Sequence, residues 1–153
     1  MGSKEATARA VEGAHTVYFV TNYWESMSRE KEVAQGKAVT DASKAAGVKH
    51  LIFSSLIDVT AATNGRLPNV AHFDGKAEIE KYIRDSGVPG TFVMPGFFMS
   101  NFFQSMKKGD DGSFTFTLPV DGGKARIPMF DSGSDSGEFL TQILEKSISD
   151  HTL

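Results

Sequence analysis

Three short apolar runs, each at strand length, restrict the fold of this chain more than any other feature. The runs are HTVYFVTN at residues 15–22, HLIFSS at 50–55 and TFVMPG at 91–96. The first run is apolar at consecutive rather than alternating positions, which is typical of a strand covered on both faces, and the second is likewise expected to be a buried strand. The distances between the runs leave room for crossover helices, so the pattern predicts parallel strands joined by right-handed connections.

Two helices are predicted between these strands. Residues 28–46 place small and apolar side chains at intervals of three and four, and a second helix is expected from about Asp74 to Ser86. A glycine followed by a valine, Gly47-Val48 and Gly87-Val88, ends each helix with a left-handed cap. Strands and helices that alternate in this way are typical of half of a Rossmann fold.

The last third of the chain departs from this alternation. The runs FTFTL at 114–118 and ARIPMF at 125–130 flank Asp121-Gly122, and this pattern predicts a β-hairpin. Asp135 and Glu138 have the spacing of a capping box, which predicts the start of a final amphipathic helix. The sequence therefore predicts an α/β fold, a partial Rossmann parallel sheet flanked by helices, with a C-terminal β-hairpin and helix.

Composition sets the class of protein. The 153 residues are 40% hydrophobic and 23% charged, which fits one domain over residues 1–153, with residues 1–12 a frayed tail or helical remnant that ends at Gly13. The absence of cysteine excludes disulfides, cysteine-zinc sites and thiol catalysis. A net charge of −3 gives no basic field for direct nucleic-acid binding. No apolar run approaches the roughly 18 residues of a membrane span, so we expect a soluble, intracellular protein without membrane contact.

Polar residues follow each predicted strand and mark a candidate ligand crevice. They lie at Thr21-Asn22-Tyr23-Trp24, at Ser54-Ser55, and from Pro95 to Asn101. Open α/β sheets bind ligands beyond the carboxyl ends of their strands, so three such groups in register favour a crevice for a nucleotide. The alternative is that these hydroxyl and amide groups only cap the helices that follow.

Four uninterrupted runs in order resemble the NmrA-like family, atypical members of the short-chain dehydrogenase superfamily. The runs are VTNYWESMSREKEVAQGK, AAGVKHLIFSSL, NVAHFDGKAEIEKYIRDSGVPGTF and PGFFMSNF. Short-chain dehydrogenases use a tyrosine four residues before a lysine, with a serine that polarises the substrate carbonyl. This chain keeps Lys76 and a serine at Ser54 or Ser55, but His72 stands where the tyrosine belongs. Histidine titrates in a range suited to an acid, and the alternative is a half-buried histidine at the start of the helix.

The resemblance implies a protein that binds NAD or NADP, lacks the catalytic tyrosine, and acts as a redox-sensing regulator through transcription-control proteins in the cytoplasm or nucleus. It also implies cofactor contacts by match to the family: strand-end residues, a helix lysine, a ribose-side lysine, and an aromatic and an amide on the nicotinamide side. These are Thr21, Asn22, Lys37, Lys76, Phe98 and Asn101. For Lys37 the alternative is a solvated surface charge. For Phe97, Phe98, Phe102 and Phe103 the alternative is core packing, which we expect for at least two of the four.

The glycine-rich turn that grips a dinucleotide in a Rossmann fold does not occur in this sequence. The pairs Gly109–Gly112 and Gly122-Gly123 lie where hairpin turns are expected, and no helix follows them. We therefore expect free cofactor to bind weakly or not at all. Without the family's preceding strands, residues 15–21 become a sheet edge, and exposed edges of this kind pair with other chains, so we expect self-association there.

Three functions are compatible with these residues. The first is a non-catalytic, NAD(P)-sensing regulator that acts through protein partners. The second is an atypical NADP-dependent oxidoreductase in which Ser54, Ser55, His72 or Lys76 assists hydride transfer. The third is a truncated fragment without activity of its own. The missing tyrosine and glycine turn favour the first over the second, and the sequence names neither the partner nor the nucleotide preferred.

Overall fold

The computed structural model describes residues 4–118, 120–121 and 124–149. The chain forms two compact units that divide between Met94 and Pro95. No helix within the described residues is long and apolar enough to cross a membrane. Each unit is built from its own short elements, and the first contains the repeated strand-helix pattern.

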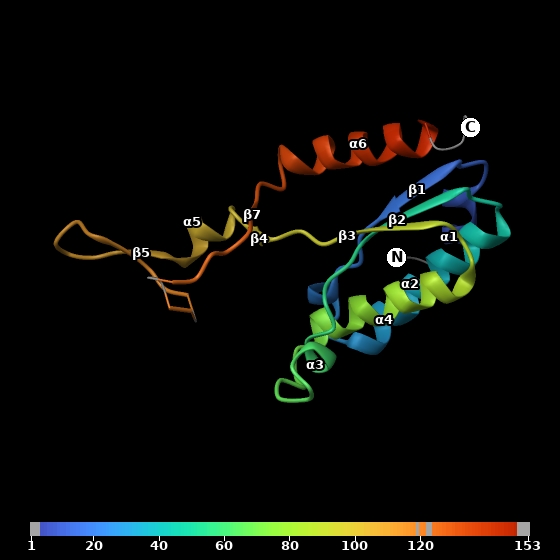
Figure 1. Cartoon of the computed structure of the whole chain (residues 1–153). Helices are drawn as coiled ribbons and strands as arrows, with labels where there is room; N and C mark the ends of the chain where they lie inside the picture. Colours follow the sequence, from blue (N-terminus) through green and yellow to red (C-terminus); the bar gives the residue numbers. More distant parts are fainter. Residues whose placement is uncertain (1–3, 119, 122–123, 150–153) are drawn as a thin grey trace. The chain divides into compact units, whose positions relative to one another are not determined.

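The first unit is a three-stranded parallel sheet with helices on one face (Figure 1). The strands β1 (Thr16–Phe19), β2 (His50–Ser54) and β3 (Gly90–Val93) lie in the order β1-β2-β3, which confirms the predicted parallel arrangement. The helices are α1 (Lys4–Val11), α2 (Arg29–Ala45), α3 (Val59–Ala62) and α4 (Ala71–Ser86), with a 3-10 turn η1 at Tyr23–Glu25.

The core of this unit lies between the sheet and the helices α2 and α4. Strand side chains pack against helix side chains in one apolar cluster of Phe19, Leu51, Phe53, Val33, Val39, Ile79, Ile83 and Val88. The two helices pack closely because Gly36 has no side chain: a Cβ at that position would lie 2.6 Å from Ile79. Such contact fixes how near α2 can approach α4.

The helix boundaries follow from local signals that the sequence carries. The Ser28 hydroxyl accepts the Lys31 backbone N–H at the start of α2, and Gly47 and Gly87 adopt φ angles of 71° and 79° after α2 and α4. The two glycines are the predicted caps, and the Ser28 cap is a further finding. The helix α4 begins at Ala71, three residues before the predicted Asp74, so His72 is helical.

Strand coverage differs between β1 and β2. Every residue of β2 is buried, as predicted for a strand covered on both faces. The same prediction is wrong for β1, because 43% of Tyr18 and 49% of the following Val20 are exposed. The reason is position: β2 is the central strand, whereas β1 is at the edge of the sheet.

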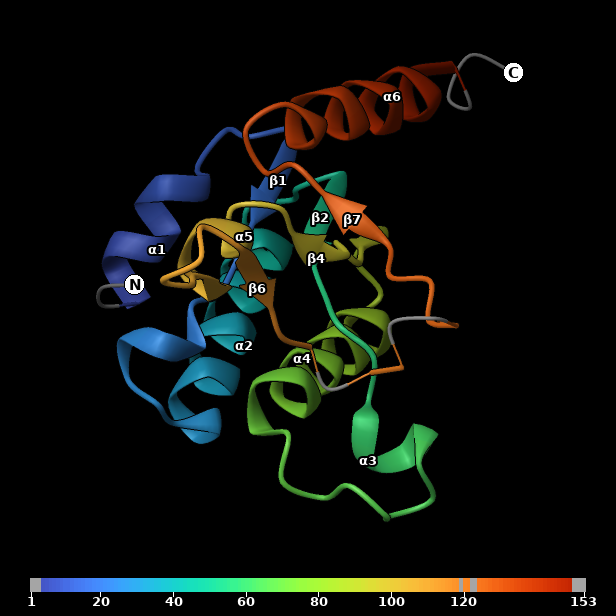
Figure 2. The ribbon, with the colours of Figure 1, turned by 90° about the vertical axis from the view of Figure 1, so that its left-hand side faces the viewer.

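The second unit consists of small paired strands and one long helix. Its elements are β4 (Phe97–Phe98), α5 (Asn101–Ser105), β5 (Met106–Lys108), β6 (Phe114–Phe116), β7 (Met129–Phe130) and α6 (Asp135–Ser149). Strand β5 pairs with β6 in an antiparallel hairpin, and β4 pairs with β7 in parallel. Figure 2 shows β4 beside β7.

Two predictions for this unit are wrong. Residues 114–116 pair with 106–108 rather than with 125–130, because the turn at Gly109–Gly112 closes the nearer hairpin: the Gly109 N–H donates to the Ser113 carbonyl at 2.8 Å. Gly122 and Gly123 lie outside the described residues. Asp135 is the first residue of α6 rather than its cap, and its carboxylate turns back to accept the Asp131 N–H at 2.8 Å.

Candidate functional site

Three polar residues meet beyond the carboxyl end of β1. Thr21 follows the strand, Glu32 projects from the first turn of α2, and Lys76 projects from α4. The Lys76 ammonium donates to the Thr21 carbonyl at 2.7 Å, to the Thr21 hydroxyl at 2.8 Å and to Glu32 Oε1 at 2.8 Å. The Thr21 hydroxyl in turn donates to the same carboxylate oxygen at 2.7 Å. Thr21 and Glu32 are buried, so these contacts lie away from solvent.

The hydrogen-bonding capacity of Lys76 is fully used in this cluster. An ammonium group has three N–H donors, and three acceptors surround this one. The second carboxylate oxygen of Glu32 is buried and has no hydrogen-bond partner within the described residues. It lies against Gly75, where an added Cβ would stand 3.2 Å away. Gly75 therefore leaves the space that this carboxylate occupies.

The other residues at the strand ends have local structural roles. The Asn22 side chain accepts the Trp24 N–H at 3.1 Å and caps the turn η1, as the alternative interpretation predicts. Ser54 and Ser55 are buried, and the Ser55 hydroxyl points to the Leu56 carbonyl at 3.4 Å. A buried serine with this partner does not present its hydroxyl to a ligand.

His72 lies in an aromatic cluster at the start of α4. Its ring centroid is 5.7 Å from that of Tyr23, 5.1 Å from that of Trp24 and 4.9 Å from that of Phe73. The residue is half-buried and is the second residue of the helix. This environment confirms the alternative of a half-buried histidine at the helix start, since aromatic packing accounts for the ring.

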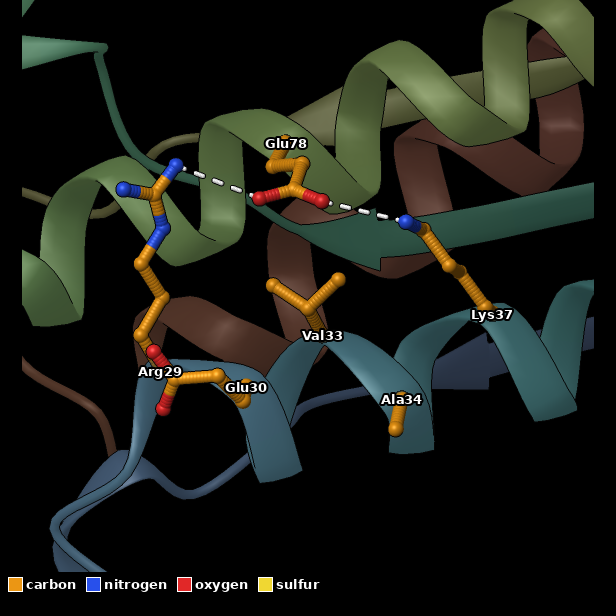
Figure 3. Close-up of a pocket in the computed structure, with 6 residues that line it drawn as sticks. All are labelled: Arg29, Glu30, Val33, Ala34, Lys37 and Glu78. Atoms are coloured by element: carbon orange, nitrogen blue, oxygen red, sulfur yellow. Dashed lines mark hydrogen bonds and ion pairs between the residues drawn. The ribbon is translucent and has the colours of Figure 1, made fainter.

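Lys37 lies in a groove between α2 and α4. Figure 3 shows Glu78 of α4 between two cations of α2, 3.2 Å from Arg29 and 3.0 Å from Lys37. The Lys37 ammonium is also 5.4 Å from the centre of the Tyr82 ring. Lys37 thus joins the two helices by an ion pair, and its prediction as a cofactor contact stays a prediction.

Phe98 and Asn101 belong to the second unit. Phe98 is in β4, with its ring centroid 5.8 Å from that of Phe130, and Asn101 is the half-buried first residue of α5. Phe97 and Phe102 are half-buried and both contact Phe116, which confirms the packing expected for two of the four phenylalanines. Phe103, at 89% exposed, does not pack in this way.

Two buried acids of the first unit were missed by the sequence reasoning. Glu32 lies beside Val33 on the buried face of α2, where a charge at an apolar position is a signal of a partner. Asp74 accepts the Val59 N–H at 2.8 Å and the Thr60 hydroxyl at 2.6 Å. Burial acts to raise the pKa of Asp74, but the bonds from Thr60 and Val59 outweigh it and hold the pKa below its ordinary value. Asp74 therefore anchors α3 as a carboxylate.

Comparison with known proteins places the chain in a family. The family described as the NmrA-like family matches residues 1–152. The nitrogen metabolite repression protein NmrA of Emericella nidulans is 34% identical over 142 residues, which are 88% of this chain and 38% of that protein. The NmrA-like family domain-containing oxidoreductase lnaB of Aspergillus flavus is 35% identical over 73% of this chain and 37% of its own length.

Solved structures agree with this assignment. The crystal structure of NmrA, a negative transcriptional regulator, has a TM-score of 0.82 at 30% identity and covers 95% of this chain. The NADPH-dependent quinone oxidoreductase QOR2 of Escherichia coli, in complex with NADPH, has a TM-score of 0.53 at 25% identity over 67% of this chain. The chain spans less than half of each of these proteins, 45% of the NmrA structure and 33% of the oxidoreductase. The chain belongs to the NmrA-like family.

Proposed function

We propose that this chain acts as a non-catalytic NmrA-like regulator, through protein partners in transcriptional control, and binds free NADP or NAD only weakly. Its relatives include nitrogen metabolite repression proteins of Emericella nidulans and Neurospora crassa. A neighbouring solved structure is a negative transcriptional regulator. The residues of the candidate site support the non-catalytic part of the proposal.

The engagement of Lys76 is the observation that carries this proposal. A ribose that used this lysine would have to replace the Thr21 and Glu32 oxygens that already accept its three donors. Glu32 would then keep a buried charge without its cation, and breaking a buried pair in this way costs about 3 to 5 kcal/mol. Lys76 therefore stabilises the packing of α2 and α4 against the end of β1.

The residue in the tyrosine position supports the same proposal. His72 packs among Tyr23, Trp24 and Phe73 and brings no phenol to the site. Ser54, the last residue of β2, and Ser55, which follows it, are both buried. A proton donor and a carbonyl-polarising hydroxyl both need to reach the substrate, and these side chains are placed for packing instead.

The described residues do not fit the pyrophosphate of a dinucleotide. A Rossmann site uses free backbone N–H groups of a glycine-rich turn and a helix N-terminus, and the sequence has no such turn. At the start of α2, Ser28 accepts the Lys31 N–H at 3.3 Å and donates to Glu30 at 2.8 Å. A side chain of the protein itself therefore caps the N-terminus of α2. We expect free dinucleotide to bind weakly.

An atypical NADP-dependent oxidoreductase is the second candidate function. It is favoured by relatives named as oxidoreductases, among them lnaB, and by the likeness to QOR2 in complex with NADPH. In that case Lys76 would have to leave Glu32 and Thr21 when the cofactor binds. The two candidates therefore differ in whether Lys76 changes partners on addition of NADPH.

Calorimetric titration with NADPH and NADH, followed by an assay of hydride transfer to quinones, tests the non-catalytic part of the proposal. We expect no saturable binding at micromolar concentrations and no oxidation of the nicotinamide above the rate without protein. Turnover that is lost in H72F and kept in the control K81M would establish the oxidoreductase instead. H72F keeps the ring packing, and Lys81 forms only a surface pair with Asp85.

Deletion of the gene in the source organism, with measurement of all transcripts, tests the regulatory part. The proposal expects a defined set of transcripts to change. Replacement of the wild-type gene by the control K81M should leave these transcripts at their wild-type levels. An unchanged transcript set would overturn the regulatory role.

A further inference from the structure

Methionine is the sulfur-containing side chain that a peroxide can oxidise in this protein, because the chain contains no cysteine. The chain contains six methionines, and the five that lie within the described residues are all exposed, namely Met27, Met94, Met99, Met106 and Met129. Oxidation converts a flexible apolar side chain into a polar one. Its effect on the protein therefore depends on what each methionine lies beside.

Met106 lies beside two phenylalanines of the second unit. In the β5–β6 hairpin it is directly opposite Phe116, and residues directly opposite each other in an antiparallel pair have their side chains on the same face. The Met106 N–H also donates to the Phe102 carbonyl at the end of α5. The ring centroids of Phe102 and Phe116 are 4.5 Å apart. Met106 is thus next to this pair of rings while 41% of the residue is exposed to solvent.

Met129 lies beside the same aromatic group in the other strand pair of this unit. It is in register with Phe97 in the parallel pair of β4 and β7, and such neighbours lie side by side on one face of a sheet. The Phe97 ring centroid is 5.9 Å from that of Phe102 and 6.2 Å from that of Phe116. Met129 is also 41% exposed. Met106 and Met129 therefore flank one group of three rings, Phe97, Phe102 and Phe116, which we call the phenylalanine cluster.

Met27 and Met94 are in a different environment. Both belong to the first unit, where Met27 follows the turn η1 and Met94 follows β3. They are more exposed than Met106 and Met129, at 64% and 48%, so a peroxide reaches them at least as easily. Neither is opposite an aromatic residue in a strand pair of the described residues. These two methionines therefore provide a reference for oxidation that leaves the phenylalanine cluster untouched.

We propose that Met106 and Met129 are oxidation sites through which a hydroperoxide loosens the second unit. The thioether sulfur attacks one oxygen of the peroxide, so that an S–O bond forms and the O–O bond breaks. The other oxygen leaves as water when the oxidant is hydrogen peroxide. The sulfur loses two electrons, the peroxide gains them, and the product is methionine sulfoxide, which methionine sulfoxide reductases convert back to the thioether.

The sulfoxide loosens this unit because its oxygen needs a hydrogen-bond donor and phenyl rings offer none. To keep its hydrogen bonds with water, the oxidised side chain has to turn away from the phenylalanine cluster, and the apolar contact with the cluster is then lost. The strands of both pairs are only two or three residues long. Such short pairs depend on side-chain packing for their stability, so the loss opens the backbone hydrogen bonds more often.

Hydrogen exchange of the full chain before and after treatment with hydrogen peroxide tests the proposal. Peptide mass mapping locates each sulfoxide, and the exchange of residues 97–118 is compared with that of the buried strand β2 in the first unit. We expect sulfoxide at both Met106 and Met129. Exchange in residues 97–118 should become faster by about fivefold or more, whereas exchange in β2 should not change. Treatment with methionine sulfoxide reductases should restore the original exchange.

Matched double variants assign the response to these two residues. M106L/M129L keeps the apolar size without an oxidisable sulfur, so its exchange should match that of wild type before treatment and should not change with peroxide. M27L/M94L should respond to peroxide as wild type does. M106Q/M129Q places polar side chains beside the cluster and should show the faster exchange without peroxide, whereas M27Q/M94Q should not.

Four results would each overturn the proposal. The first is sulfoxide at Met106 and Met129 with no faster exchange in residues 97–118, and the second is an equal response to peroxide in M106L/M129L. The third is oxidation of Met27 while Met106 and Met129 stay unmodified. The fourth is exchange that remains fast after the sulfoxides have been reduced. None of these measurements involves dinucleotide binding or transcripts, so the proposed function is tested separately.

Discussion

The Oε1 atom of Glu32 lies 2.8 Å from the Nζ atom of Lys76, and both side chains are largely withdrawn from water: none of the glutamate side chain and 12% of the lysine side chain is exposed. The pair joins α2 to α4 and, through Thr21, to the end of β1. A charge pair at this depth is costly to break because either partner alone keeps an unsolvated charge. The cluster of Thr21, Glu32 and Lys76 is therefore expected to contribute to the stability of the first unit.

We predict that K76M destabilises the chain by about 3 to 5 kcal/mol, because it leaves the buried Glu32 carboxylate without its cation. The double variant E32L/K76M removes both charges and should be much closer to wild type than K76M is. Urea unfolding followed by circular dichroism measures both. The control K81M removes an exposed pair with Asp85 and should cost no more than about 0.5 kcal/mol. Equal losses in K76M and K81M would show that the buried pair does not stabilise the fold.

A second prediction concerns the contact between α2 and α4. A Cβ added at Gly36 would lie 2.6 Å from the Ile79 side chain, so G36A should cost about 1 to 3 kcal/mol despite the higher helix propensity of alanine. Truncation of the neighbour relieves the clash, and I79A should therefore cost less in the G36A background than alone. Thermal unfolding of the four proteins gives this coupling. If the losses of stability in G36A and I79A were additive in the double variant, the clash would be relieved by movement of the helices and not by truncation of Ile79.

Gly137 supplies a matched helical control for that substitution. A Cβ at Gly137, in α6, would meet nothing within 4 Å. G137A should therefore be neutral or stabilising by up to about 1 kcal/mol, as expected when alanine replaces glycine in an open helix position. A loss in G137A comparable to that in G36A would remove the steric explanation.

The parallel sheet and its helices were predictable because their signals are local. The Ser28 cap and the glycines at 47 and 87 set the helix ends, and consecutive apolar residues marked the strands. The second unit was harder, because its strands are two or three residues long and several partners are possible for each. The Gly109–Gly112 turn decided the pairing there.

The candidate site was predictable only in part. Lys76 was identified by resemblance, but its engagement by Thr21 and Glu32 depends on contacts across 55 and 44 residues of sequence. Lys37 likewise finds Glu78 across 41 residues. A charged residue on a helix is usually solvated, so sequence reasoning does not distinguish a surface lysine from one held in an ion pair.

A third prediction concerns backbone strain at the turn after β1. Met27 has a φ of 52°, in the left-handed region that non-glycine residues rarely adopt, and its N–H donates to the Tyr23 carbonyl at 2.8 Å. M27G should be neutral or more stable by up to about 1 kcal/mol, whereas the β-branched M27V should lose about 1 to 2 kcal/mol. L67V, at another exposed position, should change stability by less than about 0.5 kcal/mol. If M27V matched L67V, the turn would be free to relax.

The last prediction concerns acid unfolding and Asp74. Hydrogen bonds from Thr60 and Val59 outweigh burial and hold the pKa of Asp74 below its ordinary value of 3.8. Since the folded pKa is the lower one, the stability from this carboxylate is complete above the unfolded pKa and is lost as the pH falls through the folded pKa. Urea unfolding from about pH 6 down to about pH 2.5 should therefore show a loss of stability that begins near the ordinary value and continues below it.

The variant D74N isolates this contribution. Its amide keeps the size of the side chain and does not titrate, so its stability should be lower than that of wild type at neutral pH and should change less in the acid range. T60V removes the hydroxyl donor and should bring the pKa of Asp74 closer to its ordinary value, so its loss of stability should be smaller and should end at a higher pH than in wild type. D41N is a suitable control because Asp41 has a different partner, the hydroxyl of Tyr82. If D74N lost stability toward low pH as steeply as D41N, the carboxylate that anchors α3 would not be the group that titrates.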